Sequence, residues 1–250
     1  MRFVDLSQPW SGDTPAFPSD ENPIIQWVKR LPKDRTYGQR ITTTLHVGTH
    51  MDAPLHWVSG ARDIANLELH KLYRSAVVAD VSDEVGEYGE ILPEHVTKKI
   101  DVRKGDIVIL HTGYHDRYFC GSDPDEEAYF LKHSGGARAL AEWVVDMELA
   151  WVGIDAGSLD HPMNSVLRDW RPDCAREAER ILGKPLDELF PEEDMQIMHT
   201  HLFKHDVYMA ENIGGDIDQV LNQRMDVCAF PWKFVGGEGA MCRIVAVFPD

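Results

Sequence analysis

Short apolar runs, many of them β-branched, recur along the chain between polar and glycine-containing segments. They predict strands at residues 3–6, 40–46, 76–82, 106–113, 149–156, 207–213 and 242–248. The run at 149–156 is apolar throughout, which favours a strand buried on both faces. Alanine and valine at helical spacing predict a helix over 136–147, and Gly183 closes a second predicted helix over 174–183.

The predicted strands and helices are interleaved, but without the regular alternation of a doubly wound sheet. We therefore expect an α/β fold with a mixed β-sheet. No linker, repeat or low-complexity tract divides the chain, so residues 1–250 are expected to form one domain. A turn-rich loop follows the first strand to residue 23. In this irregular region Trp10, Phe17 and Trp27 are expected to pack on the domain, with contact to a ligand as the alternative.

Composition and charge narrow the classes of partner. A chain of 250 residues buries most of its apolar surface on folding, so a metal ion would serve chemistry rather than stability. Lys and Arg number 25 and Asp and Glu number 42, which gives a formal charge of −17. Because nucleic acids and anionic membranes attract cationic faces, we expect neither as a partner.

The sequence carries no pattern of export or membrane insertion. No apolar run approaches the ~18 residues of a spanning helix, and MRFVDLSQPW is unlike a signal peptide. The four cysteines, which include no CxxC pair, are Cys120, Cys174, Cys228 and Cys242. We therefore expect free thiols and a cytoplasmic location.

Four residues of metal-ligand type fall within one short segment. They are His46, His50, Asp52 and His56. Gly48, Thr49 and Pro54 oppose a helix there, so an extended chain is expected. All four ligand types occupy even-numbered positions, which a strand would place on one face. Pro54 would end the strand and bend His56 toward the group.

Neutral imidazoles together with a carboxylate suit Zn²⁺, Mn²⁺ or Fe²⁺. The alternative is a polar strand with solvated histidines. That explanation serves well for one isolated histidine, but three histidines and an aspartate at same-face spacing favour a metal site.

A second group of such residues lies far downstream. His199, His201 and Glu211 again share parity. An acidic residue inside the apolar stretch 207–213 is costly unless it meets a cation, so Glu211 is a ligand candidate. A surface position at a strand end is its alternative. His201 and His205 are weaker candidates, because simple exposure also explains them.

A polar segment follows the predicted strand at 149–156. Its Asp155, Asp160 and His161 are candidates for orienting the ligating imidazoles, and a plain polar turn is the alternative. Nucleophile patterns are missing: there is no GxSxG elbow, and no GK[ST] follows the glycines at 236–239.

The run HVGTHMDAPLH (46–56) resembles the HxGTHxDxPxH motif of the metal-dependent cyclase family of hydrolases, which includes bacterial kynurenine formamidase and isatin hydrolase. Supporting likenesses are VDLSQPW (4–10), KGDIVILHTG (104–113) and GIDAGSLD (153–160). The resemblance runs from residue 3 to the C-terminus. It implies a swivelling β/β/α-type fold, hydrolysis of an amide or lactam bond, and dimers or larger assemblies.

The resemblance also implies roles for individual residues. The metal ligands it implies are His46, His50, Asp52, His199 and Glu211. His56 matches the residue that acts as acid and base beside the metal. Three departures from the formamidase pattern resemble isatin hydrolase more: Trp57 after His56, and the runs 210–218 and 229–240. The continuation AGSLDHP (156–162) and the long stretch 163–198 are further departures.

These features together predict a hydrolase of a small cyclic or aryl amide, imide or lactone. It would use water activated by Zn²⁺ or Mn²⁺, with one or two ions per chain. His56 would move the proton from water to the leaving nitrogen. The side chains expected to form an apolar wall for a flat substrate are Trp10, Phe17, Trp57, Phe203 and Trp232.

Three other functions stay open at this point. The first is an arylformamidase acting on N-formylkynurenine. The second is a metal-binding protein without activity, and the third is a metal-dependent dehydratase or cyclase that abstracts a proton instead of delivering water. The surplus of candidate ligands over the four that a closed structural site needs favours catalysis.

Overall fold

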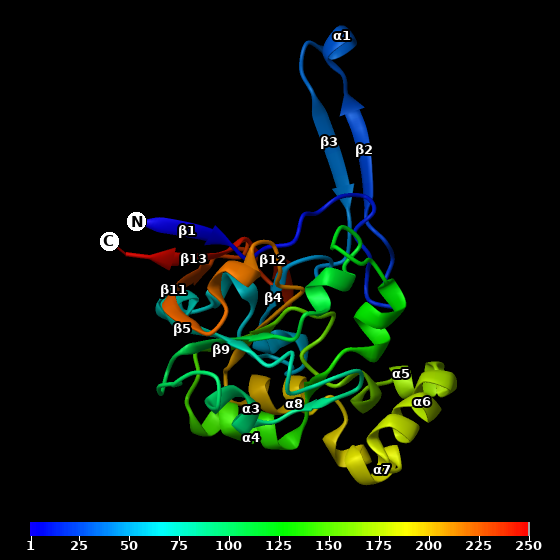
Figure 1. Cartoon of the computed structure of the whole chain (residues 1–250). Helices are drawn as coiled ribbons and strands as arrows, with labels where there is room; N and C mark the ends of the chain where they lie inside the picture. Colours follow the sequence, from blue (N-terminus) through cyan, green and yellow to red (C-terminus); the bar gives the residue numbers. More distant parts are fainter. Residues whose placement is uncertain (250) are drawn as a thin grey trace.

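A nine-stranded mixed sheet forms the centre of the computed structural model, which describes residues 1–249. In spatial order its strands are β1 (Arg2–Asp5), β13 (Ile244–Phe248), β11 (Gln223–Ala229), β5 (Tyr73–Asp80), β7 (Ile107–His111), β9 (Trp151–Ile154), β10 (Tyr208–Glu211), β4 (His50–Asp52) and β12 (Gly239–Met241). Strands β5, β7, β9 and β10 are parallel, and the remaining pairs are antiparallel (Figure 1). The predicted α/β class with a mixed sheet is confirmed.

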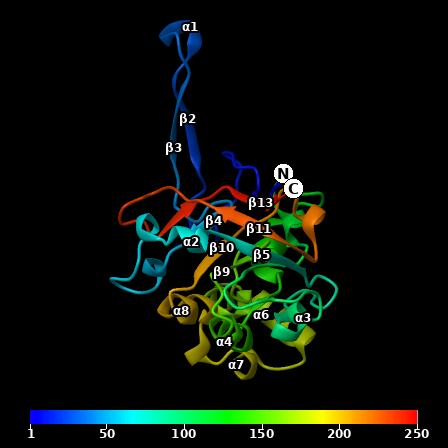
Figure 2. The ribbon, with the colours of Figure 1, turned by 90° about the vertical axis from the view of Figure 1, so that its left-hand side faces the viewer.

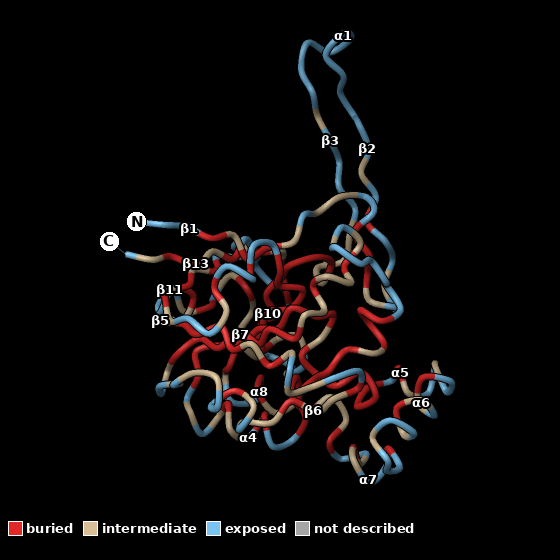
Figure 3. Tube along the Cα trace, in the orientation of Figure 1, coloured by how far each residue is buried: buried red, intermediate tan, exposed pale blue. Residues whose placement is uncertain are grey.

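Both faces of the central strands are buried, because alternate side chains enter different clusters. On β5, Val77 and Ala79 pack with helices α3 (Pro93–Thr97), α4 (Arg138–Asp146) and α8 (Ile197–Lys204). Ala76 and Val78 face the other way, toward α2 (Leu69–Leu72) and the C-terminal strands. Figure 3 shows the sheet buried throughout its centre. Burial on both faces explains why these strands are continuous apolar runs.

The long stretch 163–198 forms a separate group of short helices at one corner of the molecule (Figure 1). They are α5 (Leu167–Trp170), α6 (Pro172–Leu182) and α7 (Leu186–Leu189). Helix α6 ends at Gly183, whose φ of 72° is the left-handed conformation predicted for its closing residue. These helices pack on a third apolar cluster around Tyr88, Tyr129 and Phe190.

A two-stranded arm projects from the body of the protein. It consists of β2 (Ile24–Lys29), α1 (Leu31–Asp34) and β3 (Gly38–Thr42), and Figure 2 shows it standing clear of the sheet. Its side chains are exposed or half-buried, including Trp27 and Tyr37, whose rings meet edge to face. The prediction of a strand at 40–46 was only partly right, because β3 ends at Thr42. The first strand of the arm was not predicted, because a ribbon that is exposed on both faces shows no apolar alternation.

The other predicted strands are present with shifted ends, and β11 was missed. Its sequence, QRMDVCA, alternates in burial but contains too many polar residues to stand out. The two-residue strands β6 (Glu90–Ile91) and β8 (Gly135–Gly136) pair with each other. All four cysteines are free, as expected. Among residues 1–249, no helix combines the length and the apolarity needed to cross a bilayer.

Candidate active site

The buried strand β4, second from one edge of the sheet, carries His50 and Asp52. It lies between β10 and β12, with His50 opposite Glu211 and Asp52 opposite Gly239. His50 is fully buried and Asp52 is 1 % exposed. The spacing of two residues places both side chains on one face, as predicted, and the Nε2 atom of His50 lies 3.2 Å from Oδ1 of Asp52.

The extended conformation expected over 46–56 is wrong outside β4. His46 lies in a turn before the strand, and His56 ends the short helix η1 (Pro54–His56). The turn needs Gly48, whose φ is +74° and whose Cβ, if present, would lie 2.6 Å from Cδ1 of Trp10. This path still brings the rings together, because the centroids of His46 and His56 are 4.2 Å apart.

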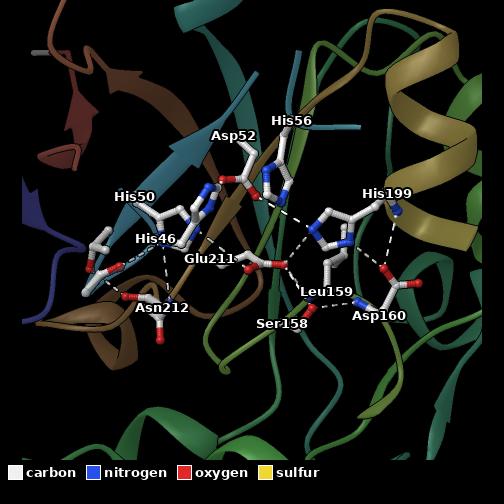
Figure 4. A network of polar contacts seen from close by, with 12 residues as sticks. His46, His50, Asp52, His56, Ser158, Leu159, Asp160, His199, Glu211 and Asn212 are labelled. Atoms are coloured by element: carbon white, nitrogen blue, oxygen red, sulfur yellow. Dashed lines mark hydrogen bonds and ion pairs between the residues drawn. The ribbon is translucent and has the colours of Figure 1, made fainter. Parts of the chain in front are cut away.

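The downstream residues complete the group from two different elements. Glu211 ends β10, and its Oε2 lies 3.8 Å from Nε2 of His50. His199 lies on helix α8, so its shared parity with Glu211 has no structural meaning. The Nε2 atom of His199 is 3.9 Å from both Oδ2 of Asp52 and Oε1 of Glu211 (Figure 4). His201 lies on the same helix but outside this group of residues. Its ring packs against the ring of the exposed His205.

Two of the imidazoles are held so that one nitrogen faces this group. The Nδ1–H of His50 donates to the carbonyl oxygen of Gly48 at 2.8 Å, and that of His199 donates to Asp160 at 2.5 Å. Each ring therefore points its Nε2 atom inward, which is the arrangement found in metal-binding histidines. Asp160, predicted to orient an imidazole, also accepts from the backbone N–H of Met198.

Buried polar atoms at the centre of the group lack hydrogen-bond partners. Within the described residues, this holds for Nε2 of His50 and for Oδ2 of Asp52, whereas Oδ1 of Asp52 lies 2.8 Å from Nδ1 of His46. Burying such atoms unpaired costs several kcal/mol in the absence of a compensating charge. The donor set of imidazole nitrogens and carboxylate oxygens fits a divalent cation. Asp52 belongs to two groupings of ligand atoms, one with His46 and His50 and one with His199 and Glu211.

The ionisation of these residues reflects the same crowding of charge. Burial favours neutral carboxyl groups, yet the neighbouring His50 and His46 hold the pKa of Asp52 well below its usual range. Burial and the charge of Asp52 raise the pKa of Glu211. Burial lowers the pKa of His199, but Asp160 outweighs it and raises that pKa to about 9. A cation bound here would displace the proton from His199 and stabilise both carboxylates.

A cavity of about 440 Å³ opens beside the group. Its lining includes Phe17, His46, His56, His199 and Glu211. Trp57 is 42 % exposed, and its ring lies 5.8 Å from that of His199. Phe203 is buried and packs against the rings of His199 and His56. It therefore holds these histidines in place and does not line the cavity.

Several predicted site residues lie elsewhere. Trp10 and Trp232 line a different cavity, where Trp10 donates to the carbonyl oxygen of Val47. Asp155 binds the backbone after β7 and the ring of His115, away from the ligand group. His161 donates to the carbonyl oxygen of Tyr88 and packs on Phe190.

Glu238 is a site residue that the sequence reading missed. Its carboxylate lies 2.8 Å from Nδ1 of His56 and also binds Nε2 of His46. Burial opposes its charge, but these two histidines lower the pKa of Glu238 to about 2. It precedes Gly239, where a Cβ would come within 2.8 Å of the His46 ring. The sequence feature that could have identified Glu238 is its position as an acidic residue among glycines, directly before a strand.

The chain matches known proteins in sequence. A family model described as "Putative cyclase" matches residues 4–161. The kynurenine formamidase of Bordetella pertussis is 31% identical over 182 residues, covering 72% of this chain and 81% of that protein. The kynurenine formamidase of Bacillus anthracis is 23% identical over 249 residues, covering 98% and 96%.

Solved structures share the fold. Isatin hydrolase A from Ralstonia solanacearum superposes with a TM-score of 0.76 at 20% identity, over 99% of this chain and 92% of that one. A structure described as a potential metal-dependent hydrolase with cyclase activity gives a TM-score of 0.69 at 21% identity, over 100% and 98%.

Replacing Asp52 with Asn tests whether this group binds metal. Asn keeps the shape but removes the charge common to both ligand groupings, so affinity for Zn²⁺ or Mn²⁺ should fall by about 100-fold or more. Titration calorimetry on chelator-treated protein measures this. Asp20→Asn, on the wall of the same cavity, serves as the control and should bind metal normally. Equal affinity in Asp52→Asn and the wild type would contradict the assignment.

Proposed function

The chain belongs to the cyclase family, as its sequence resemblance predicted, and from that premise we propose that it hydrolyses a small cyclic or aryl amide, imide or lactone. The predicted enzyme class, a hydrolase of C–N bonds other than peptide bonds, is confirmed at that level by the related kynurenine formamidases. The observation that carries the proposal is the convergence of unpaired ligand atoms beside an open cavity.

We propose that Zn²⁺ or Mn²⁺ occupies this group, with one or two ions per chain. The ligands would be His46, His50, Asp52, His199 and Glu211. Such a cation lowers the pKa of bound water toward about 7 and polarises a carbonyl group. Asp52 would be the residue common to two ions if both are present.

His56 is proposed as the group that moves protons. Its side chain lines the cavity and is 28% exposed, and its Nδ1 faces Glu238 at 2.8 Å. Because Nδ1–H donates to that carboxylate, Nε2 is available to accept the proton of the attacking water. Glu238 stabilises the imidazolium that forms. His56 then gives the proton to the leaving nitrogen, which departs as a neutral amine.

The substrate is proposed to be flat. Phe17 lines the cavity, and the exposed Trp57 adjoins the rings of His56 and His199. Aromatic walls of this kind suit an isatin-like ring. N-formylkynurenine is the second candidate, favoured by the identity to formamidases. An inactive metal-binding protein is disfavoured by the open cavity, because a purely structural site is closed by its ligands.

A panel of substrates tests the proposed reaction. It would contain isatin, N-formylkynurenine, a dienelactone and a cyclic imide, each followed by absorbance with added Mn²⁺ or Zn²⁺. We expect turnover of a ring substrate that EDTA abolishes. Turnover of N-formylkynurenine alone would contradict the ring-opening proposal in favour of the second candidate. Product mass separates added water from a dehydratase or cyclase reaction.

His56→Asn tests the proton-transfer role. We expect kcat to fall by about 10²–10⁴-fold, the usual contribution of a positioned acid–base group, while metal content stays at the wild-type value. Glu238→Gln should give a smaller fall, because it only orients and stabilises the ring. His205→Asn, an exposed histidine outside the cavity, is the control. Loss of metal in proportion to activity would instead make His56 a ligand.

We also propose that the chain forms a homodimer or larger assembly in the cytoplasm, and that the arm takes part in the interface. The apolar side chains it exposes include Ile24, Trp27, Val28, Tyr37 and Ile41. Exposed apolar surface of this kind favours association. Light scattering should show an oligomer, and Trp27→Glu combined with Ile41→Glu should shift it toward monomer. A monomeric wild type, or an unchanged mutant, would contradict this role of the arm.

A further inference from the structure

A second cluster of histidines and aspartates lies at the carboxyl ends of the parallel strands. Asp80 ends β5, His111 ends β7, and Asp155 follows β9. The short helix η3 (Tyr114–Arg117) adds His115. Ligands of α/β proteins commonly bind at this edge of a sheet.

Both imidazoles are oriented by carboxylates. The Nδ1–H of His111 donates to Asp80 at 2.9 Å, and the Nδ1–H of His115 donates to Asp155 at 3.0 Å. Asp155 is itself fixed, because its oxygens accept the backbone N–H groups of Thr112 and Gly113. Each ring is thereby turned so that its Nε2 atom points away from the carboxylate partner, which is the orientation that such partners impose on metal-binding histidines.

The free nitrogens face one further carboxylate. The helix η7 (Ile217–Val220) places Oδ1 of Asp218 3.4 Å from Nε2 of His111, and its Oδ2 3.5 Å from Nε2 of His115. Two ligands of a tetrahedral zinc ion, each about 2.0–2.2 Å from it, lie about 3.4 Å apart. The spacing therefore matches ligand atoms around an ion better than a direct hydrogen bond, whose usual length is about 2.9 Å.

The Nε2 atom of His111 gives separate evidence that a binding partner belongs at this position. Its side chain is 7% exposed, and within the described residues its buried Nε2 has no hydrogen-bond partner. Negative charge also exceeds positive charge here, since Asp116 lies 4.0 Å from Nε2 of His115 in addition to the three carboxylates already described. In the metal-free protein burial disfavours the charged ring, but Asp155 raises the pKa of His115 to about 9.

We propose that His111, His115 and Asp218 form a second divalent-cation site of the zinc type, separate from the cavity site and independent of the proposed function. Two imidazoles and a carboxylate suit Zn²⁺, and Asp218 is 66% exposed, so at least one coordination position would be open to solvent. The ion would connect η7 to the carboxyl ends of β7 and β9. Helix η7 follows β10, the strand that ends at Glu211.

Metal counting and anomalous diffraction test this site together. The wild type, Asp218→Asn and Asp216→Asn would be loaded with Zn²⁺, passed through metal-free buffer and assayed for zinc per chain. Asp216→Asn is the matched control, because it removes the same charge from an exposed position two residues away. We expect Asp218→Asn to hold one zinc fewer per chain than the other two proteins. Crystals of the wild type should show anomalous density between the two rings.

Three results would overturn the proposal. The first is a wild-type crystal with zinc at the cavity site and no density between His111 and His115. The second is an equal zinc content in all three proteins. The third is a lower content in Asp218→Asn without density at the rings, which would place the lost ion elsewhere. The diffraction measurement needs no variant, so it stands even if Asp218→Asn folds poorly.

Discussion

The buried carboxylate of Asp52 is the constraint on which the site depends. It lies on β4 between β10 and β12 and is 1 % exposed, and its Oδ1 lies 2.8 Å from Nδ1 of His46 and 3.2 Å from Nε2 of His50. An uncompensated charge in this position is costly, and in the metal-free protein the nearby His50 and His46 compensate it, because they hold the pKa of Asp52 well below its usual range. A divalent cation would bind the carboxylate and the imidazole nitrogens at once. The surrounding fold can be understood as the means of holding these atoms in place.

The order of the strands explains how distant segments reach one site. Strand β4 enters the sheet between β10 and β12, so His50 becomes a neighbour of Glu211 (Figure 4), and Asp52 becomes a neighbour of Gly239. Helix α8 packs on the adjoining face and brings His199 to Asp52. The parallel strands β5, β7 and β9 end on the side where the second histidine cluster lies. The carboxyl ends of the parallel strands thus carry two separate clusters of candidate metal ligands.

Local spacing in the sequence predicted the part of the site that lies on strands. His50 and Asp52 are two apart on β4, and Glu211 was recognised as an acid within an apolar strand. Roles that depend on tertiary contact were less accessible. Glu238 meets His56 across the fold, and Asp155 turned out to orient His115 instead of a cavity histidine. No spacing rule specifies such partners.

The fold shows the same division. Strands buried on both faces were predicted because burial imposes an apolar run, as in β7 and β9. The first strand of the arm, β2, was missed because solvent covers both of its faces, so its sequence shows no alternation between a core face and a solvent face (Figure 3). Trp10 and Trp232 show that aromatic residues alone do not identify a substrate wall, since both line a different cavity.

If the proposed mechanism is correct, metal bound at the Asp52 site is required for hydrolysis. The decisive measurement is the turnover of a ring substrate against the number of ions bound per chain, starting from chelator-stripped protein and adding Mn²⁺ or Zn²⁺ stepwise. We predict no turnover without metal, and turnover that rises in proportion to occupancy until the Asp52 site is filled. Full turnover by protein shown to be free of metal would contradict the account.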